Sequence, residues 1–429
     1  MKKKYRIILY TSIFLLCVVA SIILVVKKSN SVYEEESKPK VVKHKSMLSM
    51  NLEQTAGSGD YKTVTQSKWP TEGYKFNAEL SRCENGSTLS WDDTKKAVIV
   101  SGNLSDKCYV YFDIYQPTLA EYIKSQYTGT QGENNIYYHD SDLANGAGDN
   151  SYRYAGANPN NFVCFGSDTS PCPTDNLYRI IGVFGENYHG VTGKQLVKLI
   201  KYDYMTTDEL GTDGDYSQTY KERGMDSTYK GTYGDGERIG VYYWNYKATG
   251  SATNTWSTSL LNKTNLNTNF INYLGTTWAN KIATVTWKVG GNTWANIGTK
   301  TSSVAYTNEI TNPVTTNTTD NATTYSAKIG LMYVSDYGFA ASPDAWTLTM
   351  SSYNNTTATN NNWMYMGLYE WTISRNADTS NRAFRVNSDG RVFDGSVGNR
   401  LGVRASFNLE SSVSYVSGSG SMSDPIVIN

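Results

Sequence analysis

Three carboxylates in the C-terminal third of the chain are the residues best suited to chemistry. Glu370, combined with Asp336 or Asp389, has the residue types that glycosidases use to protonate a leaving oxygen and to attack or activate water. Nothing in the sequence places these groups at the separation that this reaction requires. A single Glu beside a Trp, here Trp371, is more often structural. We therefore expect Glu370 to support the fold, and we predict no catalytic residue.

Other catalytic and metal-binding patterns lack their required residues. The sequence has no HExxH, phosphate-loop or GxSxG motif and no Ser-His-Asp constellation. The stretch HDSDLANGAGD brings Asp140, Asp142 and Asn145 together, but its frame departs by one residue from that of a calcium loop. A solvated loop is the favoured interpretation. We therefore expect no metal and no cofactor, and we predict a protein that is not an enzyme.

The cysteines indicate an oxidising environment. Cys83, Cys108, Cys164 and Cys172 form an even set with two local spacings, whereas Cys17 lies in an apolar run. Pairing of neighbours gives Cys83–Cys108 and Cys164–Cys172. Two other pairings exist, and a zinc site is a further alternative, although the four thiols have no nearby His and do not have CxxC spacing. We predict the two disulfides between neighbours.

An apolar segment near the N-terminus predicts a membrane anchor. Residues Ile7 to Val26 are almost uniformly apolar and have basic residues on both sides. A helix of this length covers about 30 Å, the thickness of a bilayer core. The basic residues that precede the segment place the N-terminus in the cytoplasm and the remainder outside the cell. A cleaved signal peptide is the alternative, but cleavage after Ala20 leaves the apolar stretch Ile22 to Val26 at the new N-terminus.

The charge distribution argues against a nucleic-acid partner. The formal net charge is zero, but residues 1–45 hold ten Lys or Arg and only three Glu. The rest of the chain therefore has 29 basic and 36 acidic groups, a net charge of −7. Nucleic-acid binding requires a basic face, so we expect no nucleic-acid partner.

Composition and local patterns divide the chain into four parts. We expect a cytoplasmic tip and anchor over residues 1–28, a polar stalk over 29–69, a small disulfide-linked β-sandwich-like module over 70–116, and a loop-rich mixed domain over 117–429. Thr118 and Glu121 have capping-box spacing for a short helix. Tyr178 to Phe184 and Gln195 to Tyr202 are typical of a hairpin, and Gly290-Gly291 is expected to turn another. The predicted fold class is α+β.

The last of these parts resembles a known layout. The segments YRIIGVF, QLVKLIKY, WSTSLLN, YGFA, EWTISR and GVRASFNL occur in this order between residues 117 and 429. Together they resemble a family of bacterial surface domains of unknown function that has a C-type-lectin-like layout. This layout is shared with the formylglycine-generating enzyme group and with the variable proteins of diversity-generating retroelements. The more specific parts are Glu370-Trp371-Thr372, Gly402-Val403-Arg404 and Phe407-Asn408-Leu409.

This chain departs from the enzymes of that group. The oxidising members use C-terminal cysteines, and this chain has none after Cys172. The iron-dependent members need three histidine ligands, whereas the histidines here are His44, His139 and His189. The resemblance therefore implies a structural role for Glu370, Trp371 and Arg404, with Arg404 buried against Glu370 or a backbone carbonyl.

The predicted function is that of a membrane-anchored extracellular surface protein that binds or adheres to a glycan or a protein. Aromatic side chains among Asn, Asp and Thr suit sugars and protein epitopes. We expect the ligand face in the loops 353–362 and 375–381, where the resemblance to retroelement variable proteins also implies Asn-rich binding positions. The predicted ligand-binding residues are Tyr353, Asn354, Asn355, Asn361, Arg375, Asn376 and Asn381. The alternatives are a structural component of the cell envelope and, third, a glycan or cell-wall hydrolase.

Overall fold

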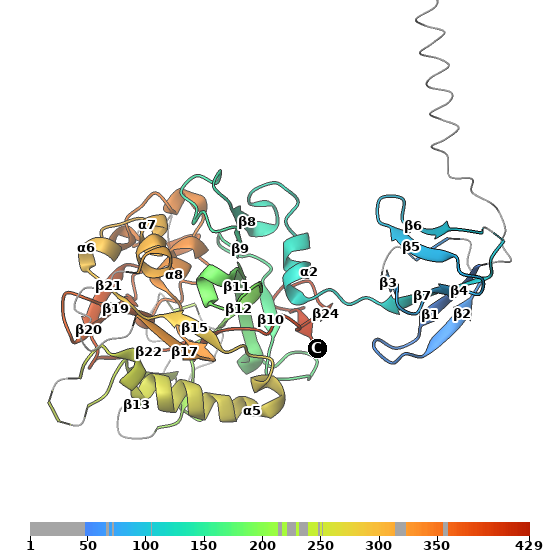
Figure 1. The fold of residues 1–429 in the computed structure, drawn as a ribbon. Coiled ribbons are helices and arrows are strands. Elements are labelled where there is room, and N and C mark those ends of the chain that lie inside the picture. The colour runs from blue at the N-terminus through green and yellow to red at the C-terminus, as the bar shows by residue number, and fades with distance from the viewer. Residues whose placement is uncertain are drawn as a thin grey trace, which may run out of the picture. The chain divides into compact units, whose positions relative to one another are not determined.

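The computed structural model of the chain contains two compact units, and the boundary between them in the sequence lies between Tyr115 and Gln116. The structure describes residues 48–65, 68–70, 73–103, 105–212, 217–220, 229–230, 239–247, 249–250, 252–313, 323–354 and 359–429. We refer to the unit that ends at Tyr115 as the small unit and to the unit that begins at Gln116 as the large unit (Figure 1). Each is described by itself.

The small unit is built from strands. Its main sheet has the order β2-β1-β7-β3, and β4 also pairs with β7. The strand β1 runs parallel to β7, so two segments about 60 residues apart in the chain form the centre of the sheet. The strands β5 and β6 form a separate hairpin. The bounds are β1 Leu48–Glu53, β2 Tyr61–Val64, β3 Tyr74–Phe76, β4 Arg82–Cys83, β5 Thr88–Asp92, β6 Ala97–Ser101 and β7 Cys108–Ile114.

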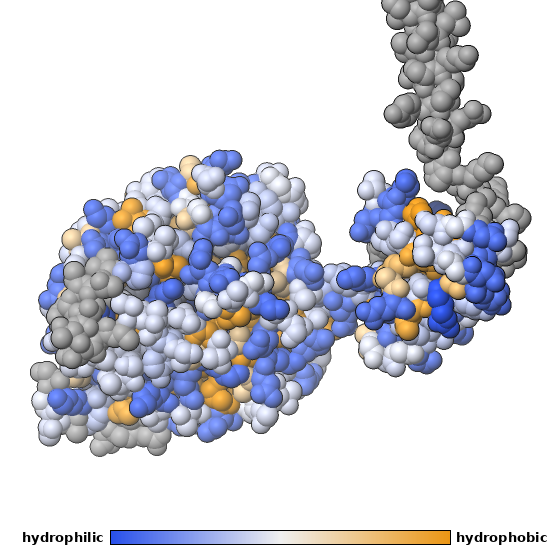
Figure 2. Space-filling model, in the orientation of Figure 1, coloured by the Kyte–Doolittle hydropathy of each residue, from blue (hydrophilic) through white to orange (hydrophobic). Residues whose placement is uncertain are grey.

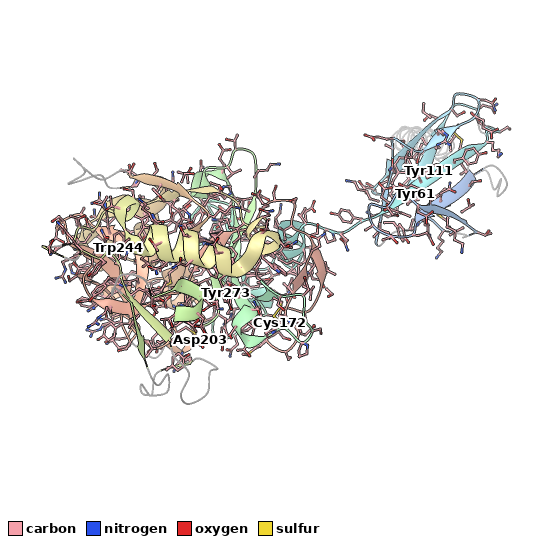
Figure 3. All side chains as sticks on the ribbon, turned by 90° about the horizontal axis from the view of Figure 1, so that it is seen from below. Tyr61, Tyr111, Cys172, Asp203, Trp244 and Tyr273 are labelled. Atoms are coloured by element: carbon pink, nitrogen blue, oxygen red, sulfur yellow. A yellow bond between two sulfur atoms is a disulfide. The ribbon has the colours of Figure 1, made fainter. Side chains whose placement is uncertain are left out.

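Alternation along β1 and β7 produces the core of the small unit. Met50 and Leu52 on β1 lie beside Val110 and Phe112 on β7, and all four are buried. Trp91 contacts Phe112 edge to face, with ring centroids 5.6 Å apart. On the same sheet Tyr61 and Tyr111 contact each other edge to face, and Figure 3 shows both rings. One apolar face per strand is enough to hold this unit together.

The large unit contains two seven-stranded sheets. The first has the order β18-β23-β12-β11-β9-β8, with β10 paired to β11, and the second has the order β13-β14-β22-β19-β20-β21, with β16 paired to β19. Two further pairs are β15–β17 and β24–β25. The first sheet comprises β8 Ile136–His139, β9 Ser151–Tyr154, β10 Phe162–Cys164, β11 Leu177–Phe184, β12 Leu196–Lys201, β18 Ile329–Gly330 and β23 Ser406–Asn408. The second comprises β13 Ser217–Tyr220, β14 Ile239–Tyr243, β16 Gly291–Asn292, β19 Glu370–Asn376, β20 Arg382–Val386, β21 Val392–Ser396 and β22 Arg400–Gly402; the remaining strands are β15 Val285–Lys288, β17 Thr324–Ala327, β24 Tyr415–Ser417 and β25 Val427–Ile428.

Most helices of the large unit are short, but η6 continues directly into α5, and Figure 1 shows a long helix at α5. Its α-helices are α2 Leu119–Ser125, α3 Glu186–His189, α4 Thr207–Leu210, α5 Ile271–Ala279, α6 Trp294–Ile297, α7 Ser302–Tyr306 and α8 Val334–Ala340. The π-helical segments are η6 Leu261–Phe270 and η7 Thr307–Thr311; the 3-10 turns are η1 Glu133–Asn135, η2 Thr174–Asn176, η5 Trp256–Thr258, η8 Pro343–Ala345 and η9 Met350–Ser352. The capping box predicted for the first helix is confirmed, because Glu121 N–H donates to Thr118 Oγ1 and Thr118 N–H donates to Glu121.

The strands β11 and β12 form the centre of the large unit. Every residue of both strands is buried, so the sheet is covered on both faces. Their antiparallel pairing confirms the hairpin predicted from YRIIGVF and QLVKLIKY. Large aromatic side chains fill the layers around the sheets, and Trp244, labelled in Figure 3, is fully buried. The interior of this unit therefore accounts for much of the aromatic content of the chain.

The predicted fold class, α+β with a mixed C-type-lectin-like domain, is wrong. The described residues are mostly in sheets, with few helices and most of these only one or two turns long. Segments expected to be loops, such as the one at Arg375 and Asn376 at the end of β19, are instead strands. In the described part of the chain no helix has both the length and the apolar character needed to cross a bilayer. The predicted membrane helix, Ile7 to Val26, lies outside the described residues.

Two further expectations need correction. The predicted stalk, 29–69, includes β1 and β2, which belong to the main sheet of the small unit; residues 29–47 lie outside the described residues. The apolar positions Leu48, Met50 and Leu52 repeat every second residue, a strand signal hidden among polar neighbours. Gly290-Gly291 does not turn a hairpin, because β15 pairs with β17 and β16 pairs with β19.

The predicted disulfides are confirmed. The structure has Cys83–Cys108 in the small unit and Cys164–Cys172 in the large unit. The first joins β4 to β7 at directly opposed positions of the sheet. The second closes the loop that leads from β10 to η2. Each disulfide therefore stabilises one unit only.

Replacing both Cys83 and Cys108 by Ser should lower the free energy of unfolding of the small unit by about 3.5 kcal/mol, because a long loop gains freedom in the unfolded chain. The matched change at Cys164 and Cys172 opens a loop of 8 instead of 25 residues and should cost the large unit about 2.6 kcal/mol. Hydrogen exchange of peptides from each unit in rising urea measures both effects separately. A loss of stability in the unit without the substitution would contradict this assignment.

Candidate functional site

The residues predicted to bind a ligand do not form one surface. Tyr353 is fully buried, and its hydroxyl contacts Ser302 Oγ at 2.8 Å and the carbonyl of Gly338 at 3.1 Å. Arg375 and Asn376 are 2% and 3% exposed at the end of β19. This prediction is wrong for these three residues. Arg375 and Asn376 are buried because β19 lies between β16 and β20, so the segment expected as a loop is an inner strand.

The remaining predicted positions are scattered. Asn354 and Asn381 are exposed and Asn361 is half-buried, whereas Asn355 lies outside the described residues. Asn381 lines a polar pocket of about 280 Å³ in the large unit. The other residues of this pocket are Tyr243, Asn245, Tyr246, Lys247, Gly250, Ala252, Ser396, Val397 and Gly398. The Arg400 guanidinium lies 5.6 Å from the centroid of the Tyr243 ring, which is one of the rings that line this pocket.

Glu370 and Arg404 form a buried ion pair. Arg404 donates from Nε to Glu370 Oε1 at 2.8 Å and from Nη2 to Oε2 at 2.9 Å, and it also donates to the carbonyl of Met364 at 2.7 Å. Both side chains are at most 3% exposed. Burial raises the pKa of the Glu370 carboxyl, and the Arg404 guanidinium partly offsets this increase. The neighbouring Trp371 is fully buried and donates from Nε1 to the carbonyl of Tyr242 at 2.9 Å.

The other carboxylates considered for hydrolysis have different basic partners. Asp336 binds Lys198 at 2.6 Å inside the large unit, and Asp389 binds Arg391 at 2.7 Å on its surface. Each of the three carboxylates is therefore held by its own cation. A glycosidase pair needs two carboxyl groups that face one substrate. The described contacts do not bring two of these carboxylates together.

The described histidines lie in apolar surroundings. Burial lowers the pKa of His139 well below its ordinary value and also lowers the pKa of His189. In each ring Nδ1 accepts a backbone N–H, from Ala147 and from Val191 respectively, which a neutral imidazole can do. Within the described ranges, no three His, Cys, Asp or Glu side chains are grouped so that they could hold a metal ion. Asp140 accepts the backbone N–H groups of Asp142 and Leu143.

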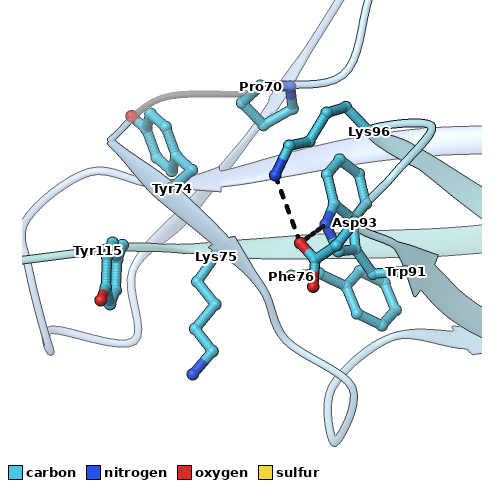
Figure 4. Close-up of a pocket in the computed structure, with 8 residues that line it drawn as sticks. All are labelled: Pro70, Tyr74, Lys75, Phe76, Trp91, Asp93, Lys96 and Tyr115. Carbon is cyan, nitrogen blue, oxygen red and sulfur yellow. Dashed lines mark hydrogen bonds and ion pairs between the residues drawn. The ribbon is translucent and has the colours of Figure 1, made fainter. Parts of the chain in front are cut away.

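The small unit contains a cleft of about 430 Å³ that combines aromatic and charged side chains. We call it the aromatic cleft, and Figure 4 shows its lining. Its residues come from the segment before β3, from β3, from the β5–β6 hairpin and from the end of β7. They are Pro70, Tyr74, Lys75, Phe76, Trp91, Asp93, Lys96 and Tyr115.

The sheet and the hairpin position the rings of the aromatic cleft. Trp91 packs on Phe112 and donates from Nε1 to Asp93 Oδ1 at 2.9 Å. The backbone N–H of Tyr115 donates to the carbonyl of Gly73 at 3.0 Å, which holds the end of β7 beside the start of β3. The ring of Tyr115 is nevertheless 39% exposed. The cleft therefore exposes part of its aromatic surface, and hydrogen bonds hold the backbone segment that carries Tyr115.

Charged groups surround the rings of this cleft. Lys96 Nζ lies 3.5 Å from Asp93 Oδ1, and this pair is exposed, with side-chain exposures of 53% and 85%. Lys75 Nζ lies 6.0 Å from the centroid of the Tyr115 ring. Figure 4 shows Lys96, Asp93 and Trp91 joined in one chain of contacts. Figure 2 shows that hydrophilic residues dominate the visible surface of both units, with smaller apolar groups between them.

This cleft was not predicted from the sequence, which placed the ligand face in the loops 353–362 and 375–381 and only a small disulfide-linked module over residues 70–116. A local signal was present: Trp91 is followed closely by Asp93 and Lys96, a charged turn next to a large ring. The opposite side of the cleft is formed by Tyr74 to Phe76 on β3. These residues lie near Trp91 because β3 pairs with β7 and because both segments pack against the same core. Sequence spacing alone does not show that these two segments meet.

Comparison with known proteins identifies no relative. No protein-family model matches the chain, and no curated protein and no solved structure matches it significantly. The resemblance to C-type-lectin-like surface domains therefore stays a prediction.

Replacing Glu370 by Gln should lower the free energy of unfolding of the large unit by about 3–5 kcal/mol, because the substitution leaves Arg404 buried without a counter-ion. The matched control is Asp389→Asn, which breaks an exposed pair and should cost less than about 1 kcal/mol. Urea unfolding of both variants measures the difference. A Glu370→Gln variant with unchanged stability and abolished glycan hydrolysis would instead favour the hydrolase hypothesis.

Proposed function

We propose that this protein is an extracellular surface protein that binds a glycan in the aromatic cleft of its small unit. The observation that carries this proposal is the combination of partly exposed aromatic rings with charged side chains in one cleft. Aromatic faces stack on the C–H surface of a sugar ring, and the polar groups at the rim bind its hydroxyls. The two disulfides support a location outside the cytoplasm.

The charges of the cleft indicate which glycans bind more tightly. The lining contains two lysines, Lys75 and Lys96, and one acidic residue, Asp93, so the cleft has an excess of positive charge. A carboxylate on the sugar binds favourably to a Lys ammonium in such a position. We therefore expect an acidic glycan to bind more tightly than its neutral counterpart, and less so as the salt concentration increases.

Attachment to the cell surface is part of this proposal. The apolar segment Ile7 to Val26 has the length and flanking charges that retain a protein at a membrane. Residues 46–429, with their net charge of −7 and their disulfides, suit the outside of the cell. A surface protein of this kind would hold a glycan-bearing partner at the envelope. The rival interpretation is an envelope component that has no ligand.

Binding of the full-length chain to an array of neutral and acidic glycans tests the proposal. Saturable binding that Tyr115→Ala weakens about tenfold or more supports it, because loss of a stacking ring costs roughly 1.5 kcal/mol. Tyr273→Ala is the matched control, since Tyr273 is a 47% exposed ring on α5 in the large unit. It should leave the affinity unchanged.

Two results would contradict the proposal. An array with no binding by a folded protein would favour the structural envelope component. Binding only to protein partners, unaffected by Tyr115→Ala or Lys96→Ala, would place the function on another surface.

A further inference from the structure

Three polar groups inside the large unit form a closed ring of hydrogen bonds. Lys198 Nζ donates to Asp336 Oδ2 at 2.6 Å and to the hydroxyl of Tyr188 at 2.6 Å. The hydroxyl of Tyr188 donates to Asp336 Oδ1 at 2.6 Å. Lys198 lies on β12, Asp336 on α8 and Tyr188 on α3, so the three residues join three elements.

Aromatic rings and two further charged side chains, Arg153 and Glu309, surround this ring of hydrogen bonds. The side chains of Lys198 and Asp336 are both 0% exposed. Lys198 Nζ lies 4.4 Å from the centroid of the Tyr333 ring and 5.0 Å from that of Trp287. The nearest further cation is Arg153, whose Nη1 is 4.0 Å from Asp336 Oδ1. An ion pair in such a place has a large desolvation cost.

Two features favour a reaction between the amine and the carboxyl group. Burial lowers the pKa of Lys198, which favours the neutral amine, the nucleophilic form. The backbone N–H of Tyr333 donates to Asp336 Oδ2 at 2.9 Å, so this oxygen has a donor that stabilises a developing negative charge. The contact of 2.6 Å places Nζ next to the carboxyl group without bound solvent between them.

We propose that Lys198 and Asp336 condense into an intramolecular isopeptide bond that covalently joins β12 to α8. The Tyr188 hydroxyl first relays one proton from Nζ to Oδ1, which leaves a neutral amine and a carboxylic acid. Nζ then attacks Cγ of Asp336 and forms the Nζ–Cγ bond, and Tyr188 relays a second proton from Nζ to Oδ1 and regains its own. The Cγ–Oδ1 bond then breaks, and Oδ1 leaves as water with two of the three ammonium protons. The reaction needs no oxidant, reductant or activated donor.

The large unit contains a matched pair without this relay. Lys201 Nζ lies 2.5 Å from Glu209 Oε1, and both side chains are at most 3% exposed. Lys201 also donates to the carbonyl of Asp175. Among the described contacts, no hydroxyl binds both Lys201 and Glu209, whereas Tyr188 binds both members of the other pair. We therefore expect Lys201 and Glu209 to stay an ion pair.

Intact-mass spectrometry of the denatured full-length chain tests the proposal directly. The measured mass should be lower than the sequence mass by one water molecule, beyond the two hydrogens lost for each disulfide. Trypsin should then yield a branched peptide that joins residues 195–201 to residues 329–375, because the linked Lys198 is no longer a cleavage site. A wild-type chain that forms both disulfides and has its full sequence mass overturns the proposal.

Variants separate the roles of the residues. Lys198→Met should retain the water, whereas Lys201→Met should lose it as the wild type does. Persisting loss of water in Lys198→Met would show that the bond lies elsewhere and would overturn the assignment. Tyr188→Phe should leave unlinked protein that can be followed over time. Equally rapid linkage in this variant would overturn the relay role of Tyr188. The branched wild-type peptide identifies the linked residues even where a variant fails to fold.

Discussion

The structure of the large unit depends on one constraint, which is that several charged side chains are buried in its interior. The strands β11 and β12 are covered on both faces, yet β12 carries Lys198 and Lys201. A buried charge is tolerated only with a partner, and each lysine has one on a different element, Asp336 on α8 and Glu209 on α4. Glu370 and Arg404 similarly join β19 to the segment between β22 and β23. The register of β12 is therefore coupled to α8, which is far away in the sequence, and to α4, which follows soon after β12, because a shift by one residue would separate both pairs.

Burial also gives several Asn side chains a structural role inside the large unit. The side-chain amide of Asn254 is buried and donates to the carbonyls of Asn376, Thr379 and Arg382. Asn265 donates to the carbonyl of Leu210 from a buried position in η6. A fold with short strands, one-turn helices and irregular connections leaves backbone carbonyls without a ladder partner, and Asn side chains satisfy some of them. These Asn side chains therefore form hydrogen bonds to the backbone inside the unit. Composition alone does not distinguish such buried Asn residues from those in solvated loops.

The parts of the fold that the sequence predicted are the local ones. The β11–β12 hairpin, the capping box at Thr118 and the disulfides depend on residues close together in the chain, so their patterns are visible without a structure. The parallel pairing of β1 with β7 and of β16 with β19 joins distant segments, and no local pattern encodes such a pairing. Two of the wrong predictions follow from this, namely the stalk around Met50 and the loop at Arg375. The resemblance led us to expect Arg404 to be buried against Glu370 or a backbone carbonyl. The spacing of these residues in the sequence does not by itself indicate this contact.

The distribution of aromatic residues separates the roles of the two units. In the large unit, Trp244, Trp287, Trp346 and Trp371 are all at most 1% exposed, so their rings stabilise the core and offer no stacking face. The small unit has too few strands to enclose all its rings, and Tyr74, Trp91 and Tyr115 keep part of their surface accessible at the aromatic cleft. Single rings such as Tyr273 and Tyr369 are exposed in the large unit as well. The feature that favours the small unit for the proposed glycan is therefore the grouping of several partly exposed rings in one cleft, and not the aromatic content of the whole chain.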